Sequence, residues 1–407
     1  MNIDRDALEI VFQAGGEMFD RRVFNSTSLS PEIKWPDENF GIDDNPMTRE
    51  KLEELSSALH NAARNSVLTH IDSKIGYTLS GGVDSSLLLY LIKKEFPDAD
   101  IAAYHTDWKF AERSELEFAK LAAKFADVPL KVIDVSPDAQ VPYVEDGLSK
   151  SKVIAYSTIP VYMVHNAMKE DNITVAVNAL GLDELFAGYI IHRRYYNRGR
   201  LHFVPNIGSL TSTKLYRGAS IKWGGDKAFI LADCVPTYSK RFVKDTSASL
   251  SALYDEKIKS GNLWLDIQRW ILFAMIGNYA NLIARPALAN GVSILFPYMN
   301  HALMALTHTY GPNVKRNKAP IRTLMRDFYG FPEEIAKRGE EWDKIGWGGT
   351  IAPYVTSKDY LDAITPTQSN EEDWFTNTGL KEYQTFPEKP TVRAIHMALF
   401  LKTFELL

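Results

Sequence analysis

Apolar and polar positions follow two alternating patterns between about residue 50 and residue 220. Residues 47–68 repeat apolar side chains at helical spacing and predict a helix whose apolar face holds Leu52, Leu55, Leu59, Ala62 and Ala63. Short, mostly apolar runs then predict four strands, at 74–79, 100–105, 130–135 and 172–180. Helical patterns separate the strands, at 85–96, 113–126 and 158–170. Strands that alternate with helices predict an α/β fold, a parallel sheet with flanking crossover helices.

The strand pattern fades after about residue 240, and helical patterns dominate from there. They lie at 247–259, 263–288, 299–310, 319–329 and 391–405. Residues 1–50 contain one short helical candidate, 4–12, followed by a Pro- and Asn-rich stretch. We therefore expect three parts: an N-terminal lead-in at 1–50, an α/β domain at 51–220, and a mainly helical, substrate-side domain at 221–407.

The turn between the first predicted strand and its helix has an unusual composition. It contains Ser80, Gly81, Gly82, Val83, Asp84, Ser85 and Ser86. Small residues at the start of a helix let backbone N–H groups approach a phosphate, and the three serine hydroxyls can donate to its oxygens. Asp84 would repel a phosphate unless a divalent cation bridged the two. The turn therefore predicts a pyrophosphate cradle with a metal ion, for which we expect Mg²⁺.

This string resembles the PP-loop of the N-type ATP pyrophosphatases, whose fold is the adenine nucleotide alpha hydrolase-like one. No Gly-Lys-Ser/Thr follows, so the string is not a Walker A loop, and it lacks the dinucleotide-binding fingerprint. The resemblance implies that ATP is cleaved between its α- and β-phosphates and that a substrate is adenylated.

A second motif, ALGLDELFAGY at 179–189, follows the fourth predicted strand. Asp183 there lies at the carboxyl end of a strand, where open α/β sheets bind ligands, and could complete a Mg²⁺ site with Asp84. The motif resembles that of asparagine synthetase and its relatives, which include β-lactam and carbapenam synthetases and lasso-peptide cyclases. Asp183 and Glu184 match the acids of that motif. The resemblance implies that Asn178 and Gly181 contact the nucleotide.

Two further site predictions depend on position and on the same resemblance. Tyr104 and Thr106 end the second predicted strand, where backbone groups would line an adenine pocket. The segment KIGWGGT at 344–350 resembles a segment of the β-lactam synthetases whose lysine stabilises charge on the reacting phosphate and carbonyl. This implies a catalytic role for Lys344, while the alternative is a solvated lysine in a Gly-rich loop.

Three positions that would serve the attacking amine or the substrate depart from the family pattern. Leu180 stands where asparagine synthetase has Glu and the β-lactam-forming enzymes have Tyr, and leucine cannot accept a proton. Ser293 and Leu295 stand where the family has Glu and Arg. Either the attacking amine arrives neutral, or another side chain supplies the base. The candidates are Tyr156, Tyr162, His165 and His192.

The composition of the chain limits the partners and the compartment that we expect. A net charge of −5 and a pI near 6.0 argue against nucleic-acid or anionic-membrane binding. Cys234 is the single cysteine, which excludes a disulfide within the chain and a two-cysteine sulfur relay. The start of the chain has no signal-peptide pattern, and no apolar run approaches the roughly 20 residues of a membrane span. We expect a cytoplasmic protein.

The resemblance to asparagine synthetase implies an ATP-dependent, amide-forming ligase. It would adenylate a small-molecule or peptide carboxylate other than plain aspartate, release pyrophosphate, and transfer the acyl group to ammonia or an amine. Because no glutaminase domain is expected before residue 50, nitrogen would come from free ammonia, an amine substrate or a separate glutaminase partner. Two alternatives stay open: an enzyme that adenylates a nucleobase or other amide carbonyl, and a degenerate, nucleotide-binding scaffold subunit.

Overall fold

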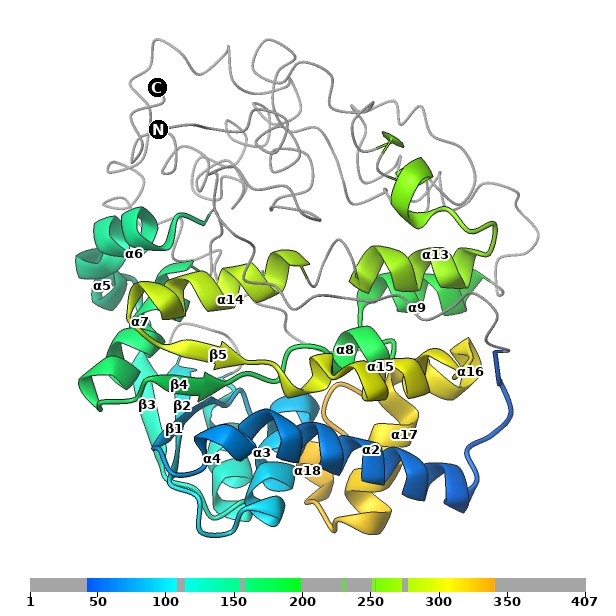
Figure 1. Ribbon diagram of the computed structural model, residues 1–407, viewed down its shortest axis with the longest axis horizontal. Coiled ribbons are helices and arrows are strands. Elements are labelled where there is room, and N and C mark those ends of the chain that lie inside the picture. The colour runs from blue at the N-terminus through cyan, green and yellow to red at the C-terminus, as the bar shows by residue number, and fades with distance from the viewer. Residues whose placement is uncertain are drawn as a thin grey trace.

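The computed structural model describes residues 42–107, 114–153, 158–198, 230, 251–252, 254–272 and 277–340 (Figure 1). The expected lead-in before residue 42, the domain boundary at 220 and the helix at 391–405 lie outside these residues.

Five parallel strands form one sheet in the order β3-β2-β1-β4-β5. Their bounds are β1 Ile75–Thr78, β2 Ile101–Asp107, β3 Leu130–Asp134, β4 Val175–Val177 and β5 Ser293–Leu295. The first four confirm the four predicted strands. In the central pairing, Gly76 of β1 lies opposite Ala102 on one side and Ala176 on the other.

The fifth strand corrects the expectation that strands end near residue 240. β5 pairs with β4, with Val175 opposite Ser293 and Val177 opposite Leu295. Three residues are too few to show a strand period, and helical patterns surround them, so β5 cannot be recognised from its local sequence. A segment from the expected helical part therefore completes the sheet.

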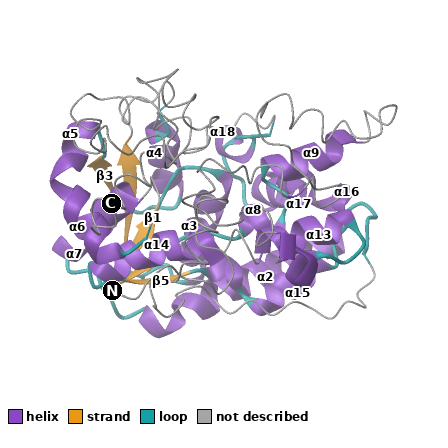
Figure 2. Ribbon diagram, turned by 90° about the horizontal axis from the view of Figure 1, so that it is seen from above, coloured by secondary structure: helices purple, strands orange, loops and turns teal. Residues whose placement is uncertain are grey.

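Helices cover both faces of the sheet (Figures 1 and 2). One layer holds α6 Val144–Ser151, α7 Thr158–Glu170 and α14 Gly277–Ala289. The other layer holds α2 Arg49–Val67, α3 Val83–Glu95 and α4 Leu116–Phe125. Against this second layer pack α15 His301–His308 and α18 Glu333–Ala336. The other α-helices of the described residues are α5 Pro137–Gln140, α8 Leu182–Leu185, α9 Ile190–Arg198, α13 Leu263–Arg269, α16 Pro312–Lys315 and α17 Ala319–Thr323.

The core follows the predicted apolar face of α2. All five residues of that face are buried, and the helix begins after Thr48, whose hydroxyl accepts a hydrogen bond from the Lys51 N–H. On the opposite face of the sheet, a Cβ at Gly76 would lie 2.9 Å from the sulfur of Met168 in α7. Glycine at that position lets α7 close on the sheet.

The strand order creates a crevice at one edge of the sheet. From β1 the chain proceeds to β2 and β3 on one side, while β4 and β5 lie on the other side. The turns after β1 and β4 therefore diverge at the carboxyl edge, and such a switch point is where open α/β sheets bind ligands. Beside the sheet, both views place α8, α9, α13, α15, α16 and α17 together (Figures 1 and 2).

The packing of α2 predicts how two leucines differ in their contribution to stability. Leu59→Ala, at a position with 0% exposure, should lower the free energy of unfolding by about 2–5 kcal/mol because it leaves a cavity. Leu288→Ala, in α14 and 55% exposed, should change it by less than about 0.5 kcal/mol. Urea denaturation of both variants checks this. Equal losses would contradict the described core.

Candidate active site

The two acids predicted from separate motifs meet at one buried lysine. Asp84 lies at the start of α3 and Asp183 lies in α8, on either side of the switch point. Lys318 Nζ is 2.5 Å from Asp183 Oδ1 and also forms an ion pair with Asp84 Oδ1. The lysine side chain is 0% exposed, whereas the two carboxylates are 19% and 20% exposed. The structure thus brings Asp84 and Asp183 together around a shared ammonium group.

The backbone fixes this lysine in place. Lys318 has a left-handed conformation with φ of 60°, as does its neighbour Asn317 with φ of 48°. Such conformations cost a non-glycine residue about 1–3 kcal/mol each and persist only where the surroundings impose them. The Lys318 N–H donates to the carbonyl of Phe186 at 3.0 Å, in the same turn as Asp183. A Cβ at Gly188 would lie 1.7 Å from Asp183 Oδ1, so only glycine leaves room there.

The predicted cradle is a compact network of hydroxyl and amide groups. Ser80 Oγ lies 2.9 Å from Ser85 Oγ and accepts a hydrogen bond from the Gly82 N–H at 3.2 Å. Gly82 is the N-cap of α3 and supplies no side-chain cap to its first turn. Such an uncapped helix start, with its partial positive charge, favours an anion. Ser86 Oγ is buried without a hydrogen-bond partner among the described residues.

Two tyrosines hold the first turn of α3 by hydrogen bonds to its backbone. One lies in β1 and the other in the 3-10 turn Pro297–Met299. The Tyr77 hydroxyl donates to the Ser85 carbonyl at 2.7 Å, and the Tyr298 hydroxyl donates to the Asp84 carbonyl at 3.0 Å. Burial raises the pKa of both phenols well above its ordinary value. Both therefore remain protonated donors, and the cradle keeps its shape without a ligand.

Arg338 links the cradle to the start of α4 through a hydrogen bond and an ion pair. Gly81 has φ of 73°, and a Cβ there would lie 2.3 Å from the backbone nitrogen of Ala119. Arg338 Nη1 donates to the Ser80 carbonyl at 3.3 Å, and its other terminal nitrogen pairs with Glu115. The guanidinium carbon lies 4.5 Å from the ring centre of Phe118. The first turn of α4 and the cradle are therefore one packed unit.

Asn178 and Gly181 shape the turn after β4. The Asn178 amide donates to Thr78 Oγ1 at 2.8 Å, and its oxygen accepts from the Leu180 N–H at 2.9 Å. Gly181 has φ of 124°, and a Cβ there would lie 2.6 Å from the end of the Met299 side chain. Both residues thus position the second motif against the cradle strand, and their contact with a nucleotide stays a prediction.

Tyr104 and Thr106, the two residues predicted to line an adenine pocket, have different surroundings in β2. The Tyr104 hydroxyl donates to Asp171 at 2.5 Å, in the turn that precedes β4, and its carbonyl accepts from the Leu79 N–H. The Tyr104 side chain therefore packs on the face of the sheet that α7 covers, and backbone contact of Tyr104 with adenine stays a prediction. Thr106 is half-buried near the carboxyl end of β2 and stays a candidate. Lys344 lies outside the described residues.

Glu184 is buried beside the acid pair. Its side chain is 1% exposed, and burial, with a smaller contribution from Asp183, raises its pKa to about 7. The Tyr189 hydroxyl donates to Oε1, while Oε2 has no hydrogen-bond partner among the described residues. Because this raised pKa makes Glu184 only partly ionised at neutral pH, it adds less negative charge beside Asp183 than an ordinary glutamate would.

The proposed substitutes for the base at Leu180 are engaged in local packing. Burial lowers the pKa of His165 to about 4 and that of His192 to about 3. His165 Nδ1 lies 2.7 Å from the Val161 carbonyl, and His192 Nδ1 accepts from the Tyr189 N–H. Both rings are therefore neutral at pH 7. Tyr162 is buried in α7, and Tyr156 lies outside the described residues.

The sequence missed Lys318 and Arg338. Lys318 stands in KRNKAP, where three basic residues show no period and resemble an ordinary solvated charge run. The one local signal is the Pro that follows it at the start of α17. Arg338 follows α18 and reaches the cradle only through the tertiary fold.

The donor set at the acid pair fits Mg²⁺ that is shared with a nucleotide. Within the described ranges, no group of three or more His, Cys, Asp or Glu side chains could hold a metal ion. Mg²⁺ in phosphate-transfer sites commonly uses one or two carboxylates and takes its other ligands from phosphate and water. Asp84 and Asp183 supply that number of oxygen ligands, and the ammonium between them shows that the position favours a cation.

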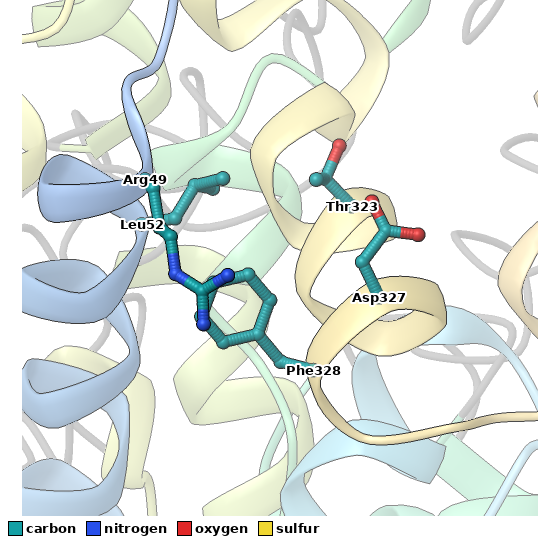
Figure 3. A pocket seen from close by; sticks show the side chains of 5 residues that line it. All are labelled: Arg49, Leu52, Thr323, Asp327 and Phe328. Carbon is teal, nitrogen blue, oxygen red and sulfur yellow. The ribbon is translucent and has the colours of Figure 1, made fainter.

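A separate surface cleft of about 420 Å³ lies between α2 and the π-helical turn Leu324–Phe328 (Figure 3). It is lined by Arg49, Leu52, Thr323, Asp327 and Phe328. The Arg49 guanidinium lies 5.8 Å from the ring centre of Phe328, and none of the lining residues belongs to the acid pair or the cradle.

The aromatic residues of helix α9 pack against neighbouring elements, whereas Arg193 is exposed. The rings of Tyr195 and Tyr196 lie 5.2 and 6.2 Å from that of Trp264, and the Tyr196 hydroxyl donates to the Pro312 carbonyl at 2.5 Å. These contacts favour a structural role for the two tyrosines.

Comparison with known proteins gives one family and several partial relatives. The model of the asparagine synthase family matches residues 54–341. A putative glutamine-hydrolysing asparagine synthetase of Methanocaldococcus jannaschii is 32% identical over 162 residues, which is 37% of this chain and 28% of that protein. A glutamine-hydrolysing asparagine synthetase of Bacillus subtilis is 23% identical over 308 residues, 67% of this chain and 46% of that protein. The chain thus spans less than half the length of these relatives.

Among solved structures, two matches are weak in overall superposition. An ammonia-dependent NAD synthetase of Campylobacter jejuni has a TM-score of 0.25 and 15% identity, over 34% of this chain and 60% of that one. A U34-tRNA thiolase of Methanococcus maripaludis has a TM-score of 0.28 and 12% identity, over 57% of this chain and 86% of that one.

Of the helices in the described ranges, none has the length and apolar character needed to traverse a bilayer.

The buried histidine of α7 predicts an acid-sensitive component of stability. The folded-state pKa of His165, about 4, lies below its ordinary 6.5, so the unfolded chain takes up the proton first as pH falls. His165 should therefore remove up to about 3 kcal/mol of stability between pH 6.5 and pH 4, and nothing above that range. His165→Gln should show a shallower decline over this interval in urea denaturation. Parallel curves for the two proteins would show that His165 is protonated as easily in the folded chain.

Proposed function

Because the chain belongs to the asparagine synthase family, we propose that it is an ATP-dependent ligase that forms carbon–nitrogen bonds. The observation that carries the proposal is the pairing of Asp84 and Asp183 around Lys318, beside the uncapped start of α3. Two acids, a buried cation and a helix N-terminus at the switch point suit the triphosphate of ATP.

Binding would place the triphosphate along the cradle. The first turn of α3 and the hydroxyls of Ser80 and Ser85 would donate to its oxygens, while Lys318 would face the β-phosphate side. Arg338 would keep the Ser80 carbonyl turned away from the phosphates by holding it against α4. Asp84 and Asp183 would hold Mg²⁺, which supplies charge neutralisation on the phosphate oxygens when bound.

Adenylation follows from this arrangement. An oxygen of the substrate carboxylate attacks the α-phosphorus, and the bond from that phosphorus to the oxygen bridging the β-phosphate breaks. The electron pair leaves with pyrophosphate, and the buried ammonium of Lys318 stabilises the charge that develops there. The product is a mixed anhydride of the substrate and AMP.

Transfer of the acyl group completes the proposed reaction. The nitrogen of ammonia or an amine attacks the acyl carbon, the carbon–oxygen bond breaks with its electron pair leaving on AMP, and the nitrogen loses a proton to water. We assign charge stabilisation in this step to Lys344 on the basis of its family segment. Leu180, whose N–H is bound to Asn178, supplies no base, so the acceptor chemistry differs from that of plain aspartate amidation.

Substitution of the cradle acid tests the proposal. Asp84→Asn keeps the size of the side chain but weakens both metal and lysine binding, so pyrophosphate release from MgATP should fall by about 10²- to 10³-fold. A panel of carboxylates and amines serves as substrates, and circular dichroism checks the fold. Asp146→Asn, an exposed carboxylate paired with Lys150, is the matched control and should retain full activity.

Two results would count against the proposal. One is undiminished pyrophosphate release by Asp84→Asn in the folded state. The other is the failure of every carboxylate to support AMP and pyrophosphate formation by the unaltered chain.

A further inference from the structure

The ammonium of Lys318 occupies the position where a metal ion would bridge the two acids. It contacts Asp84 Oδ1 and Asp183 Oδ1, one carboxylate oxygen from each side of the switch point. Its side chain is fully buried, and its backbone is bound to Phe186, next to the turn that carries Asp183. The lysine is therefore part of the framework of the site and is not a surface chain that folds into it.

This placement opposes the binding of a metal ion on its own. A divalent ion that bridged Asp84 and Asp183 would repel the ammonium and would take from it two carboxylate partners. Separating a buried charge from its partners is strongly unfavourable. Mg²⁺ would in addition give up tightly held water, which it does reluctantly.

A nucleotide removes this obstacle. The triphosphate brings several anionic oxygens to the cradle beside Lys318, so the ammonium gains phosphate partners when the carboxylates turn to the metal. The metal arrives with phosphate ligands already bound, and needs only one or two carboxylates to complete its shell. Each charged group then has a partner of opposite charge: the carboxylates have the metal ion, and the ammonium has the phosphate oxygens.

We propose that Lys318 is a resident counter-ion that keeps divalent metal ions off Asp84 and Asp183 until they arrive together with the nucleotide. This deepens the proposed function and rests on it, because it takes the acid pair as the metal site of an ATP-dependent ligase. The consequence is an order of binding: the acid pair takes up the metal–nucleotide complex and does not bind the metal alone.

Gly188 supports this assignment. A Cβ there would lie 2.7 Å from Lys318 Cε as well as 1.7 Å from Asp183 Oδ1, so the chain leaves space for the lysine at the acid pair. The left-handed conformations of Asn317 and Lys318 add a further cost to the placement. The fold accepts these constraints in order to hold a cation between the acids before any ligand binds.

Titration with Mn²⁺, followed by the paramagnetic resonance signal of the unbound ion, tests the proposal on the full chain. Without nucleotide, the unaltered protein should show no saturable site below millimolar Mn²⁺. Lys318→Met should gain one site per chain, at least about 100-fold tighter, because the ammonium that lies between the two carboxylates is then absent. Lys318→Met combined with Asp84→Asn should lose the gained site.

A matched control comes from an exposed lysine. Lys150→Met removes an ammonium that pairs with Asp146 at the surface, and it should leave Mn²⁺ binding as weak as in the unaltered chain. If Lys318→Met does not fold, the titration of the unaltered protein still decides, since a tight Mn²⁺ site in the absence of nucleotide overturns the proposal. A folded Lys318→Met that gains no site overturns it as well.

Binding of MnATP to the unaltered chain separates this inference from the proposed function. Tight MnATP binding together with a tight site for Mn²⁺ alone rejects only the role of Lys318. Absence of MnATP binding rejects the assignment of the cradle to ATP, and with it the proposed function.

Discussion

The candidate site depends on one buried ammonium that two carboxylates share. Lys318 joins Asp84, at the start of α3, to Asp183, in the turn after β4. Each acid alone would be an ordinary residue in the first turn of a helix. Because a buried charge needs its partners nearby, the ion pairs bind the two halves of the site together. The rest of the site is arranged around this contact.

The fold supplies the constraints that keep the contact in place. The strand order puts the turns after β1 and β4 on either side of a crevice. Gly188 gives the lysine its space, and the N–H of Lys318 is bound to the Phe186 carbonyl. On the other side of the cradle, Arg338 joins Ser80 to Glu115. Two cations from the segment 318–338 thus contact the cradle. Lys318 pairs with the Asp84 carboxylate, and Arg338 donates to the Ser80 carbonyl.

The sequence predicted the parts of this structure that have local causes. The period of α2 and the apolar runs of β1 to β4 follow from neighbouring residues, and the cradle and Asp183 were recognised in short motifs. Lys318 and β5 could not be predicted, because each depends on contacts between segments far apart in the chain. Tyr104 shows the same limit: it lies in the middle of β2, which extends to Asp107, and its hydroxyl donates to the distant Asp171, while backbone contact with adenine remains a prediction. Lys344 and the domain boundary at 220 remain predictions.

The most direct measurement is a crystal structure of the protein with Mg²⁺ and α,β-methylene ATP, an analogue that cannot be cleaved between the α- and β-phosphates. The account predicts those phosphates at the first turn of α3, the metal ion between Asp84 and Asp183, and Lys318 turned to a phosphate oxygen. A nucleotide bound in the cleft of Arg49 and Phe328, with Lys318 still on both carboxylates and no metal beside them, would contradict it.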